Sequence, residues 1–172
     1  MKRNIIPTDQ ERVMRDDDFI VSKTDPTGRI IYCNRIFIEF AGFTEQELLH
    51  QQHNIVRHPD MPRAVFDLLW KTIKSGNEFL GYIKNINKDG SFYWVFANVT
   101  PSKHNGNELL GYYSVRRKPN PAKVREISAV YREMLQEEKR IGPKNAIQSS
   151  QQVLNKLIEP TGKDYREFIL SF

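Results

Sequence analysis

The sequence predicts an α+β protein in which an antiparallel sheet carries its helices on one face. Two β-rich runs joined by a turn come first, over residues 19–33. A segment with helical spacing and helix caps follows, over residues 34–74. Three further strand-like runs, over residues 78–117, are joined by Asp-Gly and Asn-Gly pairs. This order is typical of a sheet that starts with a hairpin, ends in a meander and collects its helices on one side.

The first two strands are predicted over Phe19–Lys23 and Arg29–Cys33, which are rich in β-branched and aromatic side chains. The intervening Thr24–Gly28 contains Asp, Pro and Gly, which suit a tight turn. The two runs therefore form a hairpin.

Helix signals occupy the next forty residues. Asn34 can cap a short helix that Gly42 ends, and Thr44 with Glu47 forms a capping box for another. After a loop over His50–Pro59, Pro62 suits the first position of a long helix that ends near Lys74. Its buried stripe is predicted to comprise Val65, Phe66, Leu69, Trp70 and Ile73.

The last three strands are predicted over Glu78–Asn87, Ser91–Pro101 and Glu108–Arg117. Asp89-Gly90 and Asn105-Gly106 lie at the joints, and such pairs are strong hairpin signals. These strands complete a five-stranded sheet.

The chain divides into a polar N-terminal arm over residues 1–18, with room for a short helix, a sheet domain over 19–120 and an extension over 121–172. The extension has helical spacing over Ala122–Arg140 and over about residues 144–158. Two roles stay open for these helices: packing on each other or the sheet, and serving as an output element that docks a partner.

Composition excludes several classes. The 172 residues include 26 Lys and Arg against 21 Asp and Glu, for a net charge of +5 that is spread along the chain, which argues against nucleic-acid binding. The single cysteine, Cys33, forms no internal disulfide. Because the sequence lacks a signal peptide and an 18-residue apolar run, we expect a soluble, cytoplasmic protein that does not insert into membranes.

Several stretches resemble a known family over roughly residues 17–120. Asp25–Asn34 and Phe40–Leu49 resemble the generic core of PAS domains. His53–Pro62 and Tyr93–Asn98 are more specific, because they resemble the flavin-binding PAS domain of bacterial aerotaxis receptors. The fold that this resemblance implies is a PAS fold with a C-terminal helical extension.

The whole chain looks closest to the stand-alone soluble PAS protein of two-protein energy-taxis systems. The resemblance implies non-covalent FAD, whose redox state reports electron flow, and a separate membrane-bound chemotaxis transducer of the methyl-accepting type as partner. It leaves open whether that transducer contains a HAMP domain and whether the chain forms a homodimer.

Strand alternation selects the side chains that reach a ligand. If Asn85 faces inward, so do Phe79, Gly81 and Ile83, and its amide matches the pyrimidine edge of a flavin. Capping of the strand end is the alternative role of Asn85. On the next strand the same alternation turns Tyr93, Val95, Ala97 and Val99 inward. Trp94 and Phe96 then face outward and need a cover, which is the arm, the C-terminal helices or a partner.

The remaining cofactor candidates come from the last strand and from the family motif. Ser114 and Arg116 share the inward parity, with an ordinary role in the sheet as the alternative. By resemblance Arg57, His58 and Asp60 hold the cofactor, and Asp60 is expected to cap the long helix and orient Arg57 or His58. A solvated charged loop is the alternative. The other candidates are His53 and Asn54 over the ring, Trp70 as a ring contact or plain core, and Asn34, which also caps a helix.

Light-sensing flavin PAS domains use a cysteine beside the ring, and this sequence has none between His50 and Trp70. Signalling by redox change is therefore expected. Because the sequence contains no catalytic or metal-binding motif, we also expect no catalytic residue, no metal and no enzyme activity. Two alternatives stay open. One is a haem-binding PAS gas sensor with His50, His53 or His58 as axial ligand, and the other is a cofactor-free PAS interaction module.

Overall fold

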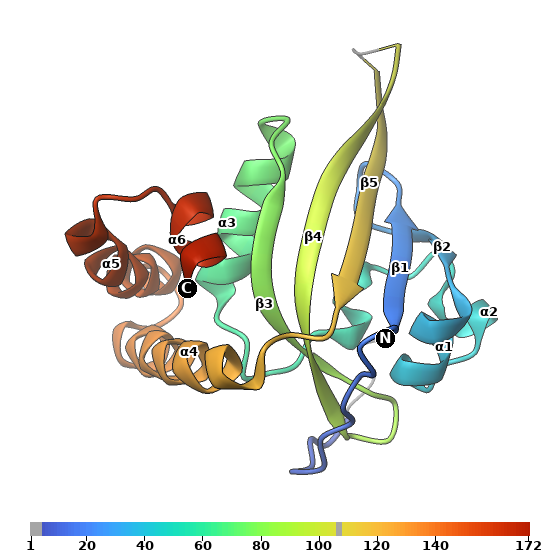
Figure 1. Ribbon diagram of the computed structural model, residues 1–172, viewed down its shortest axis with the longest axis horizontal. Coiled ribbons are helices and arrows are strands. Elements are labelled where there is room, and N and C mark those ends of the chain that lie inside the picture. Colours follow the sequence, from blue (N-terminus) through green and yellow to red (C-terminus); the bar gives the residue numbers. More distant parts are fainter. Residues whose placement is uncertain (1–4, 106–107) are drawn as a thin grey trace.

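The computed structural model describes residues 5–105 and 108–172. Its five strands form one antiparallel sheet with the order β2-β1-β5-β4-β3 (Figure 1). The strands are β1 (Phe19–Thr24), β2 (Ile30–Cys33), β3 (Phe79–Ile86), β4 (Phe92–His104) and β5 (Glu108–Arg117). The predicted α+β class with a five-stranded antiparallel sheet is confirmed.

Four helices lie between β2 and β3, and the first two begin where the caps predicted. They are α1 (Arg35–Ala41), α2 (Glu45–Leu48), the 3-10 helix η1 (His53–Val56) and α3 (Arg63–Lys74). Asn34 Oδ1 accepts from Phe37 N, and Gly42 adopts a left-handed conformation with φ 70°. Thr44 and Glu47 form the predicted capping box. The sequence analysis described the segment containing η1 only as a loop.

The start of α3 differs from the prediction. Pro62 is the N-cap residue and not the first helical residue, and no side chain of the preceding loop caps the helix. Instead the Ala64 amide donates to Glu138 Oε1 at 3.2 Å, 74 residues away in sequence. The expected capping of this helix by Asp60 is therefore wrong.

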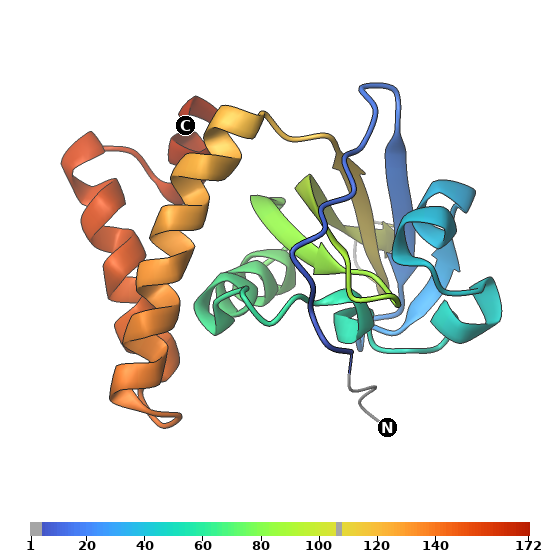
Figure 2. The same ribbon diagram turned by 90° about the horizontal axis from the view of Figure 1, so that it is seen from below.

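Three helices follow the sheet: α4 (Pro121–Ile141), α5 (Ala146–Ile158) and α6 (Tyr165–Ser171), with a 3-10 helix η2 (Glu159–Thr161) before the last. They lie beside the edge strand β3, away from α1 and α2 (Figures 1 and 2). The predicted pair is confirmed, whereas α6 was missed although Asp164 and Glu167 form a capping box.

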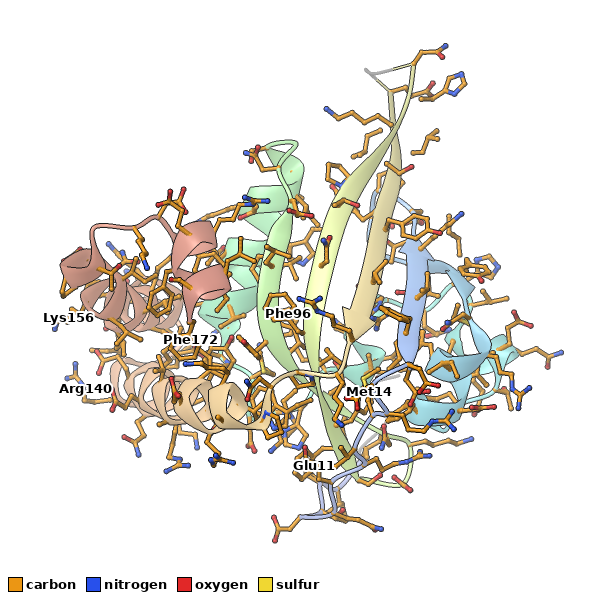
Figure 3. All side chains as sticks on the ribbon, in the orientation of Figure 1. Glu11, Met14, Phe96, Arg140, Lys156 and Phe172 are labelled. Atoms are coloured by element: carbon orange, nitrogen blue, oxygen red, sulfur yellow. The ribbon has the colours of Figure 1, made fainter. Side chains whose placement is uncertain are left out.

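The C-terminal helices cover the outward aromatic row. The Trp94 ring stacks on Tyr131 of α4 with 6.3 Å between centroids, and Tyr131 Oη donates to the Tyr82 carbonyl at 2.9 Å. Phe172 contacts Tyr82 beside β3 (Figure 3). Of the three covers considered for Trp94, the structure selects the C-terminal helices.

Phe79 departs from the predicted grouping with Asn85. Its ring stacks on Tyr165 of α6 with 5.8 Å between centroids, so the residue belongs to the contact with the helical extension. Strand parity alone does not separate the two ends of β3, because the inner helices cover one end and α6 covers the other.

The N-terminal arm is extended, and the short helix for which the sequence left room is absent from residues 5–18. Its backbone runs along the start of β4, where Phe92 N donates to the Gln10 carbonyl at 2.9 Å and Arg12 N donates to the Phe92 carbonyl at 2.7 Å. Met14 is buried within the core. Gly90 makes the predicted turn with φ 89°, whereas the Asn105-Gly106 turn falls partly outside the described residues.

Candidate functional site

A cavity of about 180 Å³ lies between the inner face of the sheet, α3 and the loop around η1. We call it the cup. Its apolar wall includes Phe66, Leu69 and Ile73 of α3 together with Ile83 and Val99 of the sheet. Seven of the ten candidate cofactor residues also line it: His53, Asn54, Arg57, Trp70, Asn85, Ser114 and Arg116.

Arg116 places a positive charge at the cup. Only 2% of the residue is exposed, its guanidinium lies 4.5 Å from the centre of the Phe37 ring, and Nη2 donates to Ser22 Oγ. Nε and Nη1 are buried and have no hydrogen-bond partner within the described part of the chain. Burial lowers the pKa of Arg116 to about 10, so the side chain is still charged at neutral pH.

Asn85 presents a second unpartnered donor. The residue is buried on β3, opposite Tyr93 of β4, and its backbone also bridges to Arg57 in the loop. Its Nδ2 makes no hydrogen bond of good geometry within the described residues, although the amide lies close enough to the Tyr93 hydroxyl to counteract part of the burial that raises the pKa of Tyr93 to about 12. A buried amide without a partner costs free energy, so this side chain fits a role towards a ligand better than the strand-capping role.

His53 closes one side of the cup. Its Nε2 lies 3.0 Å from Ser22 Oγ, and its ring stacks on Phe37 with 5.7 Å between centroids. Burial, with the nearby Arg116 charge, lowers the pKa of His53 to about 3. The imidazole is therefore neutral at pH 7, and Ser22 links it to Arg116.

Arg57 and Trp70 lie where the cup opens. Arg57 Nη2 donates to the Met61 carbonyl at 3.1 Å, and its guanidinium lies 4.1 Å from the Phe66 ring centre. Trp70 meets Tyr112 edge to face, with 5.5 Å between centroids. A Cβ added at Gly28 would lie 2.9 Å from the Trp70 ring, so only glycine fits beside this indole.

Three candidates lie away from the cup wall. The side-chain amide of Asn34 has a structural role. Its Oδ1 accepts from Val21 N, and its Nδ2 donates to the Phe19 carbonyl. His58 is buried behind the loop, where Nδ1 accepts from Asp60 N at 3.0 Å, and burial lowers its pKa to about 4. Asp60 is exposed and pairs with Lys84 Nζ at 2.7 Å. Asp60 therefore positions His58 through its backbone amide, as part of the loop scaffold.

The cup also contains residues that were not singled out as candidates. Phe66 and Leu69 belonged to the predicted stripe of α3, and Tyr112 shares the parity of Ser114. Ser22 of β1 does not line the cup but lies next to it: it shares the parity of buried Ile20 and Thr24, a pattern visible in the sequence, yet its contacts to His53 and Arg116 depend on tertiary structure.

The cup has the chemistry of a site for a flat, mainly apolar ligand with polar atoms on one edge. Donors on Asn85 and Arg116 share the cup with the apolar side chains of α3 and the sheet, and a mainly apolar pocket with a few polar groups is the usual construction of a cofactor pocket. Its volume is below the roughly 300–1,000 Å³ of typical ligand pockets. Phe66, Leu69 and Trp70 on its wall are only half-buried, and a flat tricyclic ring would need them to turn outward.

The PAS fold family model matches residues 30–115, which run from β2 into β5 and include most of the residues that line the cup. The chain therefore belongs to the PAS family, as the order of its strands and helices indicated.

Among curated proteins, the chain is 38% identical over 125 residues to the aerotaxis receptor of Escherichia coli (strain K12), covering 73% of this chain and 24% of the receptor. The nitrogen fixation regulatory protein of Klebsiella oxytoca is 29% identical over 97 residues, which is 56% of this chain and 20% of that protein. The chain thus spans about a quarter of the length of these relatives or less.

Solved structures agree on the fold. The light-state structure of the LOV domain of the blue-light photoreceptor Aureochrome1 superposes with a TM-score of 0.57 at 18% identity, covering 64% of this chain and 88% of that one. The LOV domain of a blue-light activated histidine kinase from Erythrobacter litoralis gives 0.52 at 18% identity, covering 58% and 94%.

Two features of the described residues bear on other classes of function. None of the helices there is long and apolar enough to cross a membrane. Within the same residues, no three His, Cys, Asp or Glu side chains gather as metal ligands do. Cys33 is buried at the end of β2 and does not line the cup.

Proposed function

We propose that the chain is a cytoplasmic, non-enzymatic PAS redox sensor that binds FAD and signals to a separate membrane-bound chemotaxis transducer in aerotaxis or energy taxis. The observation that carries the proposal is the pair of unpartnered buried donors, on Asn85 and Arg116, at the edge of an apolar cup. The identity to an aerotaxis receptor and the likeness to LOV domains support a flavin as the ligand.

The residues present fit a flavin. Its ring carries carbonyl oxygens and ring nitrogens along one edge, and the donors of Asn85 and Arg116 can meet these acceptors. The apolar side chains of α3 and β4 suit its flat faces, and Trp70 lies at the open side of the cup. Bound flavin supplies reversible electron transfer.

The chain contributes charge and connection to that chemistry. Arg116 is a fixed positive charge that favours negative charge on a neighbouring ligand. Arg116 also lies on β5 and bonds Ser22 of β1, which bonds His53 in the loop. A change in the ligand's hydrogen bonds at Arg116 or Asn85 therefore acts directly on three strands and on the loop before α3.

The visible spectrum of the purified protein, before and after dithionite, tests this proposal. We expect a two-peaked flavin spectrum that bleaches on reduction, with FAD released on denaturation. A Soret band would replace the proposal with a haem sensor. A colourless protein that takes up no FAD on refolding would instead indicate a cofactor-free interaction module.

A further inference from the structure

A second, larger cavity lies on the far side of Arg57. This outer groove has a volume of about 1,330 Å³ and runs between the loop before α3 and the C-terminal helices. Leu135, Glu138 and Lys139 of α4 and Ala146 of α5 form one wall. Figure 2 shows α4 and α5 side by side next to α3. The extension therefore builds part of a cavity and does not only cover the sheet.

The outer groove adjoins the cup. Gln52, Asn54 and Arg57 line both cavities. Arg57 lies at the junction, with its guanidinium held against the Phe66 ring. A ligand with a ring in the cup and a long polar substituent could extend past these three side chains into the groove.

The charges in the groove favour an anion. Four cationic side chains line it: Arg29, Arg57, Arg63 and Lys139. The two carboxylates there are already engaged, because Glu47 pairs with Lys88 Nζ at 2.9 Å and Glu138 accepts from Ala64 N. Within residues 5–105 and 108–172, Arg63 and Lys139 form no ion pair.

Apolar surface lies beside these cations. Ile55 and Met61 of the loop face the groove together with Leu135 and Ala146 of the extension. Cations next to apolar walls match a ligand that carries phosphates and a flat base, since arginine and lysine bind phosphate and the walls can contact the base.

We propose that the outer groove holds the ADP half of FAD, so that α4 and α5 form part of the cofactor site and select FAD over shorter flavins. This inference rests on the proposed flavin function. Arg57 contacts the pyrophosphate where it leaves the cup, and Arg63 with Lys139 contacts the outer phosphate and ribose.

This placement gives the extension a physical link to the cup. Glu138 lies beside Lys139 on α4 and caps α3 through the Ala64 amide. Helix α3 also carries Phe66, Leu69 and Trp70, which lie on the cup wall. A ligand that fills the groove therefore holds α4 against the start of α3, and loss of the ligand removes that support.

The test measures binding of FAD, FMN and riboflavin to the full-length apoprotein of wild type and of Lys139→Glu. We expect the wild type to bind FAD more tightly than riboflavin. Lys139→Glu should weaken FAD binding about tenfold, because it reverses a charge beside the phosphates, and should leave riboflavin binding unchanged. ADP should compete with FAD and not with riboflavin.

Arg132→Glu is the matched control. Arg132 is an exposed cation on the same helix, two turns before Lys139, and does not line the groove. It should change none of the three affinities. Arg63→Ala provides a second variant from the opposite wall and should repeat the loss for FAD alone.

The outcomes separate the two proposals. Flavin binding with equal affinity for FAD and riboflavin, or equal effects of Lys139→Glu on both, overturns the groove assignment and leaves the flavin function standing. A wild-type apoprotein that binds none of the three flavins overturns both proposals.

Discussion

The two faces of the sheet differ in whether their buried polar groups have hydrogen-bond partners. On the outer face, Tyr131 stacks on Trp94 and its hydroxyl donates to the Tyr82 carbonyl, so the aromatic contact is closed and its polar atom is paired. On the inner face, Asn85 and Arg116 retain buried donors without partners beside a cavity. The outer face is built for stability, whereas the inner face fits a ligand that completes its hydrogen bonds.

The largest effect is expected on the outer face. Trp94→Ala should lower the free energy of unfolding by about 3–5 kcal/mol, because it removes a large buried ring and leaves a cavity under α4. Urea denaturation measures this loss. Ile31→Ala, at a side chain that is 49% exposed on β2, is the control and should change stability by less than about 0.5 kcal/mol. A loss below about 1 kcal/mol for Trp94→Ala would mean that α4 does not pack there.

A smaller effect is expected from acid at His53. The folded protein holds the pKa of His53 at about 3, against about 6.5 in an unfolded chain, so the unfolded state binds more protons between these values. Stability should therefore fall as the pH drops from 7 to 4, by about 2–3 kcal/mol from this residue. Denaturation of the apoprotein at several pH values measures the slope.

His53→Gln should reduce that slope, since glutamine keeps a polar side chain near Ser22 and does not titrate. His104→Gln, at an exposed residue of the β4–β5 hairpin, is the control and should leave the slope as it is in the wild type. Equal slopes for wild type and His53→Gln would show that His53 is not buried as described.

A smaller effect on stability, with the opposite sign, is expected at Arg116. Arg116→Met should stabilise the apoprotein by about 1–2 kcal/mol, because it replaces a buried cation that has no carboxylate partner in the described residues with an apolar side chain. The same change should lower the amount of flavin per polypeptide. Urea denaturation of the apoprotein and absorbance of the loaded protein measure the two results.

Tyr131→Phe is the matched change on the other face. It removes a paired hydroxyl and should destabilise the protein by about 1 kcal/mol while leaving flavin content unchanged. Destabilisation by both variants, with flavin content retained in Arg116→Met, would remove the contrast between the two faces.

Local signals predicted the elements well because they act over a few residues. Asn34 and Gly42 bound α1, the Thr44–Glu47 capping box starts α2, and Asp89-Gly90 turns β3 into β4. The capping box Asp164–Glu167 was equally available and could have revealed α6. The end of β4 at His104, three residues beyond the predicted Pro101, has no comparable signal, because pairing with Glu108 and Leu109 of β5 extends it.

For the candidate site, too, local patterns predicted some features and only the tertiary structure decided others. Alternation along the strands predicted the inward positions of Asn85, Ser114 and Arg116, since side chains of one parity share a face. The family motif placed Arg57 at the cup, but the same motif grouped it with Asp60, which pairs with Lys84 at the surface. Adjacency in sequence does not fix which residues of a loop turn inward.

By itself the sequence determined the strands and most of the helices, the inward parity and the family motif, because each depends on neighbours a few residues apart. Only the tertiary structure decided that Arg116 has no carboxylate partner among the described residues and that Glu138 caps α3 from α4. It also decided that the C-terminal helices form one wall of a groove that shares lining residues with the cup. These features depend on contacts between segments far apart in the chain, and no local pattern encodes them.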